Sequence, residues 1–257
     1  PLKDKFRKRW TRPSNALTAR FFNAFIIRLT SLGNTELINN DSLETDFAQF
    51  GPLGLHPNLL ESLQRLKFTT PTPIQAQSIP LALAGKDFIG IAQTGTGKTL
   101  AFGLPMLDKL SKNKGMQGLI IVPTRELAIQ VEETFHKVAR HLGVRTALLI
   151  GGTSFFHQKQ ALRDHPHILI GTPGRMIDHL KQKTLQLSQV GILVLDEADR
   201  MLDMGFAPQI KQILKEVPSN RQTMLFSATM PSELLQIAHS YMQSPLRVEV
   251  APSGSTA

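Results

Sequence analysis

Cysteine is absent from this chain of 257 residues, which excludes disulfide bonds, cysteine–zinc sites and a thiol nucleophile. No apolar run reaches the roughly 18 residues that a membrane span needs. The eight histidines are scattered, and His165 and His167 have no carboxylate at ligand spacing, which argues against a histidine metal site. These absences do not fix a compartment, and our expectation is a cytoplasmic protein.

Acidic residues are few, with 20 Asp and Glu against 29 Lys and Arg, so the formal net charge is +9. A basic protein suggests a polyanionic partner, nucleic acid first. Residues 1–30, however, contain eight basic residues and one acid, which gives +7 and leaves +2 for the rest. The charge therefore characterises the N-terminal segment more than the body of the protein.

Three segments follow from the composition. Residues 1–45 are predicted to be a basic, solvated and partly ordered extension, with a nucleic-acid arm, a membrane-surface helix and an organellar transit segment as open alternatives. Residues 46–250 carry most of the apolar residues and have the length of one α/β domain. Residues 251–257 are small and polar and resemble the start of a linker.

Short apolar runs alternate with helical patterns throughout residues 46–250. Continuous Ile, Val and Leu runs indicate strands buried on both faces, and their alternation with helices predicts a mostly parallel sheet of about seven strands with helices on both sides. The expected strands are Asp87–Ala92, Leu119–Val122, Thr146–Ile150, Ile168–Ile170, Ile192–Leu195, Met224–Phe226 and Arg247–Val250. The expected helices include Leu59–Leu66, Thr99–Leu110, Arg125–Leu142, Gly174–Lys181 and Pro208–Glu216.

A glycine-rich segment, Ala92–Thr99, lies between an expected strand and an expected helix. Glycines there allow backbone amides to surround phosphate oxygens, and the helix N-terminus adds partial positive charge. Lys98 can reach the β- and γ-phosphates, and the Thr99 hydroxyl can bind Mg²⁺. The alternative is a strand–helix turn that binds nothing, and the first position of the usual pattern is Ala92 rather than glycine. The nucleotide-binding residues predicted here are Thr94, Gly95, Thr96, Gly97, Lys98 and Thr99.

A second polar cluster ends the apolar run Ile192–Leu195, where three carboxylates occur within four residues. A buried strand delivers such residues to the carboxyl edge of the sheet, where open α/β folds bind ligands. Asp196 is placed to hold Mg²⁺ directly or through water, and Glu197 to orient or deprotonate an attacking water. A solvated acidic loop is the alternative, although a cation explains the mutual proximity of the carboxylates better.

These segments resemble the signature motifs of DEAD-box ATP-dependent RNA helicases, in that family's order, over roughly Phe47 to Pro252. Asp196–Asp199 spells D-E-A-D, Phe68–Gln75 resembles the Q motif and Ala92–Thr99 resembles motif I. The remaining segments resemble motif Ia, the GG element, the TPGR element and motif III: Pro123–Ala128, Gly151–Gly152, Thr172–Arg175 and Ser227–Thr229. So many motifs in order identify the chain as a member of the family, with a RecA-like P-loop domain.

The resemblance implies ATP and Mg²⁺ as ligands, with Lys98, Asp196 and Glu197 as the catalytic residues. Gln75 would hydrogen-bond the adenine edge with both ends of its side-chain amide, and Phe50 would stack on the adenine ring. Phe50 could instead be a core aromatic, since Phe47 and Phe68 are nearby candidates for either role, and Phe68 is expected to be packed.

The resemblance also implies RNA binding through phosphates and 2′-hydroxyls, without readout of base sequence. The expected contact residues are Pro123, Thr124, Arg125, Gly152, Thr172, Pro173 and Arg175. For Arg125 and Arg175 a salt bridge at a helix start is the alternative. Ser227 and Thr229 would hydrogen-bond Asp199 and couple the nucleotide state to RNA binding.

A second RecA-like domain, which carries arginine fingers, is implied as a partner. The chain ends about where that domain would begin. We therefore expect a monomer that binds ATP, ADP and RNA weakly, hydrolyses ATP slowly and does not unwind a duplex. Two other functions stay open: a non-catalytic RNA-binding scaffold, which the intact phosphate and acidic motifs disfavour, and a DNA translocase, which Gln75 and the D-E-A-D spelling disfavour.

Overall fold

The computed structural model describes residues 50–250. The predicted 1–45 extension, the 251–257 linker and the alternative role of Phe47 lie outside the described residues and stay predictions. Within the described part, a short 3₁₀ helix, η2 (Gly51–Leu53), and two further helices precede the first strand. From there strands and helices alternate up to an edge strand, with two helices between the fifth and sixth strands.

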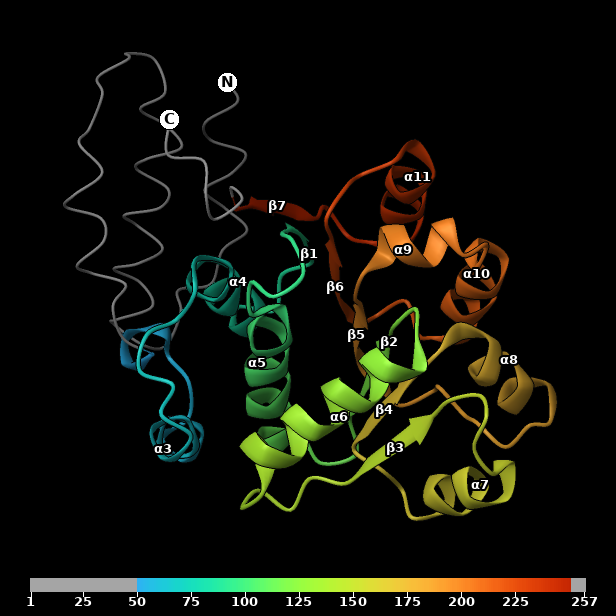
Figure 1. Cartoon of the computed structure of the whole chain (residues 1–257), viewed down its shortest axis with the longest axis horizontal. Coiled ribbons are helices and arrows are strands. Elements are labelled where there is room, and N and C mark those ends of the chain that lie inside the picture. Colours follow the sequence, from blue (N-terminus) through green and yellow to red (C-terminus); the bar gives the residue numbers. More distant parts are fainter. Residues whose placement is uncertain (1–49, 251–257) are drawn as a thin grey trace. The chain divides into compact units, whose positions relative to one another are not determined.

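Seven strands form one parallel sheet (Figure 1) in the order β3-β4-β2-β5-β6-β1-β7. Each neighbouring pair along this order is parallel, so the predicted fold class is confirmed. The strands are β1 (Phe88–Ile91), β2 (Gln117–Ile121), β3 (Thr146–Leu149), β4 (Ile168–Gly171), β5 (Val190–Leu195), β6 (Gln222–Ser227) and β7 (Leu246–Glu249).

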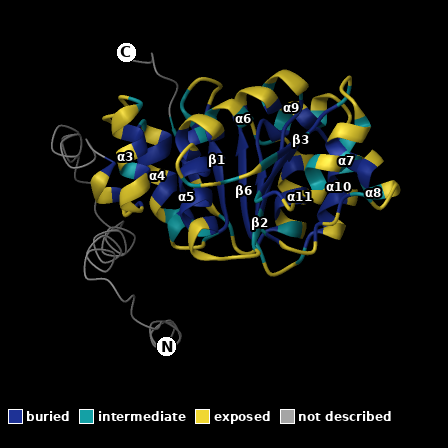
Figure 2. Ribbon diagram, turned by 90° about the horizontal axis from the view of Figure 1, so that it is seen from below, coloured by how far each residue is buried: buried dark blue, intermediate teal, exposed yellow. Residues whose placement is uncertain are grey.

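Helices cover both faces of the sheet. One apolar cluster lies under α3 (Pro57–Arg65), α4 (Pro73–Leu83), α5 (Lys98–Lys112) and α6 (Arg125–Ala139). The other lies under α7 (Phe155–Arg163), α8 (Pro173–Lys181), α9 (Ala198–Asp203), α10 (Ala207–Glu216) and α11 (Ser232–Tyr241). Adjacent strand residues alternate between the clusters, as Ile120 and Ile121 do, because successive strand side chains point to opposite faces. Figure 2 shows the buried strands between two helix layers that are exposed on their outer sides.

Burial on both faces was predicted for every strand, and this is wrong at both edges of the sheet. Only Val248 of β7 is buried, and β3 alternates between buried and half-buried residues. Each edge strand has a neighbouring strand on one side only, so it is less completely covered. Which strands lie at the edges depends on the strand order, and this order cannot be read from apolar runs. The expectation that Phe68 is packed is also wrong, since 43% of this residue is exposed.

Candidate functional site

The strand order divides the carboxyl edge of the sheet into two halves. Six of the seven predicted motifs lie where the chain leaves a strand at this edge, because the sheet is parallel, and the seventh, Phe68–Gln75, leads into α4. The neighbours β5, β6 and β1 lead into Asp196, Ser227 and the phosphate loop. The neighbours β3, β4 and β2 lead into Gly151, Thr172 and Pro123. The first half therefore holds the residues predicted to bind nucleotide, and the second those predicted to bind RNA.

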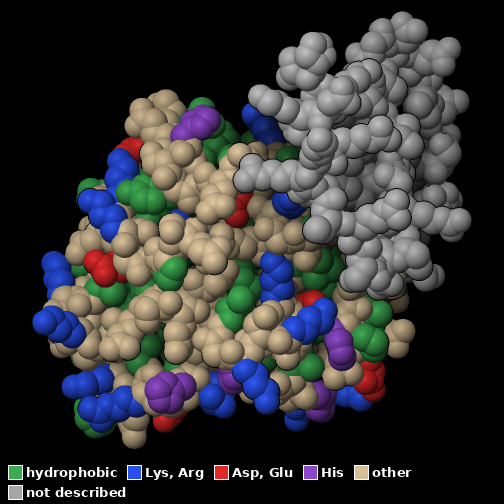
Figure 3. Space-filling model, turned by 180° about the vertical axis from the view of Figure 1, so that it is seen from behind, with side chains coloured by type: hydrophobic (Ala, Val, Ile, Leu, Met, Phe, Trp, Pro, Cys, Tyr) green, Lys and Arg blue, Asp and Glu red, His purple; other side chains and the backbone are tan. Residues whose placement is uncertain are grey.

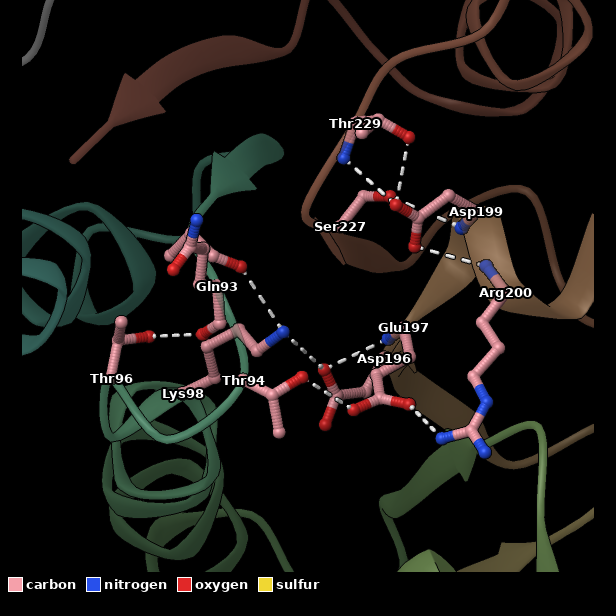
Figure 4. Close-up of polar contacts among 11 residues, drawn as sticks. Gln93, Thr94, Thr96, Lys98, Asp196, Glu197, Asp199, Arg200, Ser227 and Thr229 are labelled. Carbon is pink, nitrogen blue, oxygen red and sulfur yellow. Dashed lines mark hydrogen bonds and ion pairs between the residues drawn. The ribbon is translucent and has the colours of Figure 1, made fainter. Parts of the chain in front are cut away.

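The phosphate loop follows β1 and closes on the first turn of α5. Gly95 and Gly97 have φ of 85° and 91°, a left-handed conformation that glycine adopts without strain. Lys98 is 6% exposed, and its Nζ donates to the Ala92 carbonyl oxygen at 3.2 Å and lies 3.9 Å from Asp196 Oδ1. The lysine thus extends from the phosphate loop towards the acidic motif (Figure 4), an arrangement that places a positive charge where phosphate oxygens could be held.

Gln75 connects the start of α4 to the phosphate loop. Its Oε1 accepts a hydrogen bond from the Thr72 backbone N–H at 2.9 Å, and its Nε2 donates to the Gly97 carbonyl oxygen at 3.0 Å. Both ends of the amide therefore have partners within the chain. An amide has a second N–H and a second lone pair, so hydrogen bonds to adenine would add to these contacts or replace them.

Replacing Gln75 with Ala is expected to weaken ATP binding by up to about tenfold and to reduce the preference for ATP over GTP, because one hydrogen bond contributes roughly 0.5–1.5 kcal/mol. It should also lower thermal stability, since Gly97 and Thr72 lose a buried partner. The measurement is the Kd of each nucleotide. Gln77→Ala, an exposed position of the same helix, is the control, and an unchanged ATP affinity in Gln75→Ala would refute the role.

Two of the aromatic residues considered for stacking on adenine differ sharply in exposure. Phe50 is 5% exposed and belongs to the apolar cluster under α3 to α6, which is the packing that the alternative prediction described. Phe68 is much more exposed, as noted above. Stacking of Phe50 on adenine stays a prediction, and it requires the ring to become accessible.

The acidic motif follows β5 and is buried. Asp196 and Glu197 are 2% and 7% exposed, and burial raises the pKa of Asp196 to about 6, although the nearby Lys98 opposes this change. Glu197 Oε1 accepts a hydrogen bond from Thr94 Oγ1 at 3.1 Å, and Oε2 is 3.0 Å from Arg200 Nη1. Glu197 also has φ of 51°, which is rare for a residue with a side chain, costs roughly 1–3 kcal/mol and tends to occur at functional sites.

Asp199 links the acidic motif to the end of β6. Thr229 donates to Asp199 Oδ2 from both its backbone N–H and its Oγ1, at 2.8 Å each, and Ser227 Oγ accepts from the Asp199 backbone N–H at 3.1 Å. Partial burial acts to raise the pKa of Asp199, but the hydrogen bonds from Thr229 and around Ser227 outweigh it and lower that pKa. Asp199 is thus a charged acceptor at neutral pH, and Figure 4 shows it beside the nucleotide half of the site.

On the other half, Arg125 joins the loops after β2 and β3. Its Nη1 donates to the Gly151 carbonyl oxygen at 3.2 Å, so a hydrogen bond to backbone replaces the salt bridge considered as an alternative. Gly152 has φ of 74°, and a side chain at this position would collide with the Arg125 guanidinium. Thr124 accepts from Leu127 N and caps α6. These contacts position Arg125 at the exposed edge.

The loop after β4 presents Arg175 from the first turn of α8. Arg175 Nη1 donates to the Thr153 carbonyl oxygen at 3.2 Å, and Nε is 3.7 Å from Asp178 in the same helix. The alternative of a salt bridge at a helix start is therefore realised in part. Pro123, Thr172 and Pro173 are buried, so they shape the strand–helix turns, and their predicted contact with RNA would have to use the backbone.

Four residues that the sequence analysis did not single out take part in contacts at this edge or directly beneath it: Arg200, Thr153, Gln158 and His179. Arg200 lies three residues after Glu197, a spacing that favours side-chain contact on a helix, so this pair could have been foreseen. The other three meet only in the fold. In the range 50–250 no group of three or more His, Asp or Glu residues could hold a metal ion, and no helix of that range is long and apolar enough to cross a bilayer.

The chain resembles known proteins of one family. Residues 72–237 match the family model described as DEAD/DEAH box helicase. The chain is 53% identical over 202 residues to the DEAD-box ATP-dependent RNA helicase CshA of Bacillus cereus, covering 78% of this chain and 38% of that protein. It is 45% identical over 226 residues to the ATP-dependent rRNA helicase RRP3 of Debaryomyces hansenii, covering 87% and 47%.

A solved structure of a DEAD box protein from Methanococcus jannaschii resembles the fold with a TM-score of 0.75 at 37% identity. The likeness covers 79% of this chain and 56% of that chain. The chain spans about two fifths of the length of CshA, and less than half of the length of RRP3.

Proposed function

Because this chain belongs to the DEAD/DEAH box helicase family, we propose that it supplies the RecA-like ATP-binding domain of an ATP-dependent RNA helicase. In this proposal it binds ATP and one side of an RNA strand, and a second RecA-like domain completes the active site. The observation that carries the proposal is the 3.9 Å distance between Lys98 Nζ and Asp196 Oδ1. Lys98 begins α5 after the phosphate loop, and Asp196 directly follows β5. The pair joins the phosphate loop to the acidic motif.

The phosphate loop would hold the nucleotide through its backbone amides and through Lys98. The lysine side chain is buried, and within the described residues it contacts only the Ala92 carbonyl oxygen and, at longer range, Asp196. Phosphate oxygens are stronger acceptors for an ammonium group than a peptide carbonyl is. ATP binding would therefore exchange a hydrogen bond to a neutral acceptor for one to a charged acceptor.

A magnesium ion fits the chemistry of the same edge. Asp196 is a buried carboxylate whose raised pKa reflects the cost of keeping a charge there, and a bound divalent cation would relieve that cost. Thr99 is the second candidate ligand, on the first turn of α5. When bound with ATP, Mg²⁺ would neutralise phosphate charge, and one or two protein ligands suffice because water and phosphates complete its shell.

Glu197 is the best-placed general base. Thr94 and Arg200 hold its two carboxylate oxygens, so the side chain is fixed beside the phosphate loop although its backbone is strained. A carboxylate at this position can orient water and accept its proton. Arg200 thereby becomes a candidate for holding Glu197 in its resting orientation.

The loops after β2, β3 and β4 would bind the RNA backbone. Arg125 and Arg175 carry positive charge at this edge, and both are held by loop carbonyl oxygens, which leaves further N–H groups of each guanidinium for phosphate. On the face drawn in Figure 3, basic side chains occur as separate spots and not as one continuous patch. The proposal of RNA binding therefore rests on Arg125 and Arg175 and not on an extended basic surface.

The test compares RNA with DNA of the same sequence as activators of ATP hydrolysis, in a protein that joins this chain to its second RecA-like domain. We expect single-stranded or short duplex RNA to stimulate hydrolysis and DNA to have little effect. Equal stimulation by DNA would favour a translocase, and binding of RNA without any hydrolysis would favour a scaffold. The monomeric state and the cytoplasmic location stay predictions.

A further inference from the structure

A buried polar cluster lies beneath the edge proposed to bind RNA. His179 and Gln158 are 0% and 5% exposed, although both are polar and neither takes part in the nucleotide half of the site. Buried polar groups cost free energy unless they are hydrogen-bonded, and these two bond to each other, with His179 Nε2 and Gln158 Oε1 at 3.0 Å. The pair joins α8, which follows β4, to α7, which follows β3.

The direction of the hydrogen bond between Gln158 and His179 can be assigned. Gln158 Nε2 is 2.8 Å from the Ile150 carbonyl oxygen, which can only accept, so the NH₂ end of the amide must face it. Oε1 therefore accepts from His179 Nε2, which must carry a hydrogen. Burial, with a further effect of Arg175, lowers the pKa of His179 to about 4. The ring is neutral at pH 7, and its Nδ1 and the His179 carbonyl oxygen lie 2.8 Å and 3.1 Å from Thr184 Oγ1, as two acceptors for the one hydroxyl hydrogen.

The same two residues support the loop after β3. Gln158 Nε2 also donates to Thr153 Oγ1 at 2.6 Å, and Thr153 Oγ1 donates to the Ile150 carbonyl oxygen at 3.2 Å. Thr153 directly follows Gly152, the glycine that lies against Arg125. The amide of Gln158 therefore fixes the turn from which the loop reaches the surface.

They also support Arg175 by two routes. The ring of His179 stacks on the ring of Phe155, with 4.0 Å between centroids and 12° between planes. The guanidinium of Arg175 lies over the same Phe155 ring, 5.7 Å from its centroid. Arg175 Nη1 also donates to the Thr153 carbonyl oxygen. The Arg175 side chain is 14% exposed, so its orientation is set by these supports and not by solvent.

We propose that Gln158 and His179 are positioning residues for RNA binding: they hold the Thr153 loop and the Arg175 guanidinium in one fixed arrangement. The proposal rests on the proposed function, because it takes the loops after β3 and β4 as RNA contacts. Hydrogen bonds weaken steeply with distance and angle, so loosening this cluster lowers RNA affinity although neither residue contacts RNA.

The test uses Gln158→Met, which keeps the length of the side chain, and His179→Phe, which keeps a flat ring on Phe155. Each variant of the 257-residue chain is expected to bind RNA about fivefold more weakly, and the double variant little more weakly than either single one, since residues in one network are non-additive. ATP affinity should stay within about twofold. RNA affinity is measured by fluorescence anisotropy, and His239→Phe, an exposed position on α11, is the control.

Hydrogen–deuterium exchange supplies a readout that needs no RNA. In the variants, exchange should accelerate in residues 150–156 and 172–176 and stay unchanged in the phosphate loop, 92–99. Unchanged exchange in both segments, or a parallel loss of RNA and ATP affinity, would overturn the proposal. If the unaltered chain does not bind RNA, the proposed function fails, while the exchange comparison still decides whether these residues position the loops.

A milder variant guards against failure to fold. Thr184→Val removes the hydroxyl that lies 2.8 Å from His179 Nδ1 and 3.1 Å from the His179 carbonyl oxygen, and it keeps the shape of the side chain. We expect the same pattern with a smaller loss of RNA affinity. An increase of exchange spread over the whole domain, in place of these two loops, would assign the cluster to general stability and overturn the positioning role.

Discussion

The Glu197→Gln variant is expected to lose most of its ATP hydrolysis and to bind ATP almost as the unaltered protein does. A positioned general base contributes roughly 10²–10⁴-fold to rate, and an amide cannot accept the proton of the attacking water. The substitution keeps the shape of the side chain and an oxygen for the hydrogen bond from Thr94. Single-turnover hydrolysis and ATP affinity are measured in the protein that joins this chain to the second RecA-like domain.

Glu233→Gln is the matched control, because Glu233 is exposed on α11 and pairs with Lys211 away from the site. It should leave both quantities unchanged. Two outcomes would contradict the assignment of Glu197: hydrolysis within a few-fold of the unaltered rate, or a loss of ATP binding as large as the loss of hydrolysis. The second outcome would mean that Glu197 holds the site together and is not its base.

Replacing Lys98 with Ala is expected to weaken ATP binding by roughly 10- to 100-fold, since a hydrogen bond to a charged group contributes about 1.5–3 kcal/mol. The lysine is buried between the Ala92 carbonyl oxygen and Asp196, so no neighbouring basic side chain can substitute for it without moving. Equilibrium binding of ATP to the 257-residue chain measures this effect directly.

Lys112→Ala provides the comparison within the same helix. Lys112 lies on the last turn of α5, where it pairs with Asp108, and its removal should leave ATP affinity unchanged. Equal affinity in the Lys98→Ala and unaltered chains would contradict the proposed phosphate site. A loss caused by unfolding is recognised by the melting temperature, which should fall little in Lys98→Ala.

Much of the fold could be predicted because its central strands are continuous apolar runs and because some helices begin at a side-chain cap or at proline, as α6 and α8 do. The starts of α5 and α6 differ from the prediction by at most one residue. Helices α4, α7, α9 and α11 were not among the predicted ranges. Helix α4 is buried on most sides and contains Pro80, a residue that normally indicates the end of a helix. Edge positions were missed because strand order depends on tertiary pairing.

The nucleotide half of the site was more accessible to sequence reasoning than the RNA half. Its residues follow directly from strand ends, so motif and geometry coincide at Lys98 and Asp196. The cluster beneath Arg175 depends on Gln158 and His179, which are 21 positions apart and meet only because β3 and β4 are neighbours. A single histidine in a helix has no periodicity that indicates its partner.

The most direct test of the central claim is calorimetric titration of the 257-residue chain with ATP, with and without Mg²⁺. The account predicts saturable binding at one site that weakens when Mg²⁺ is removed, because Asp196 and Thr99 are its proposed protein ligands. A folded chain that shows no saturable binding at millimolar ATP would contradict the account.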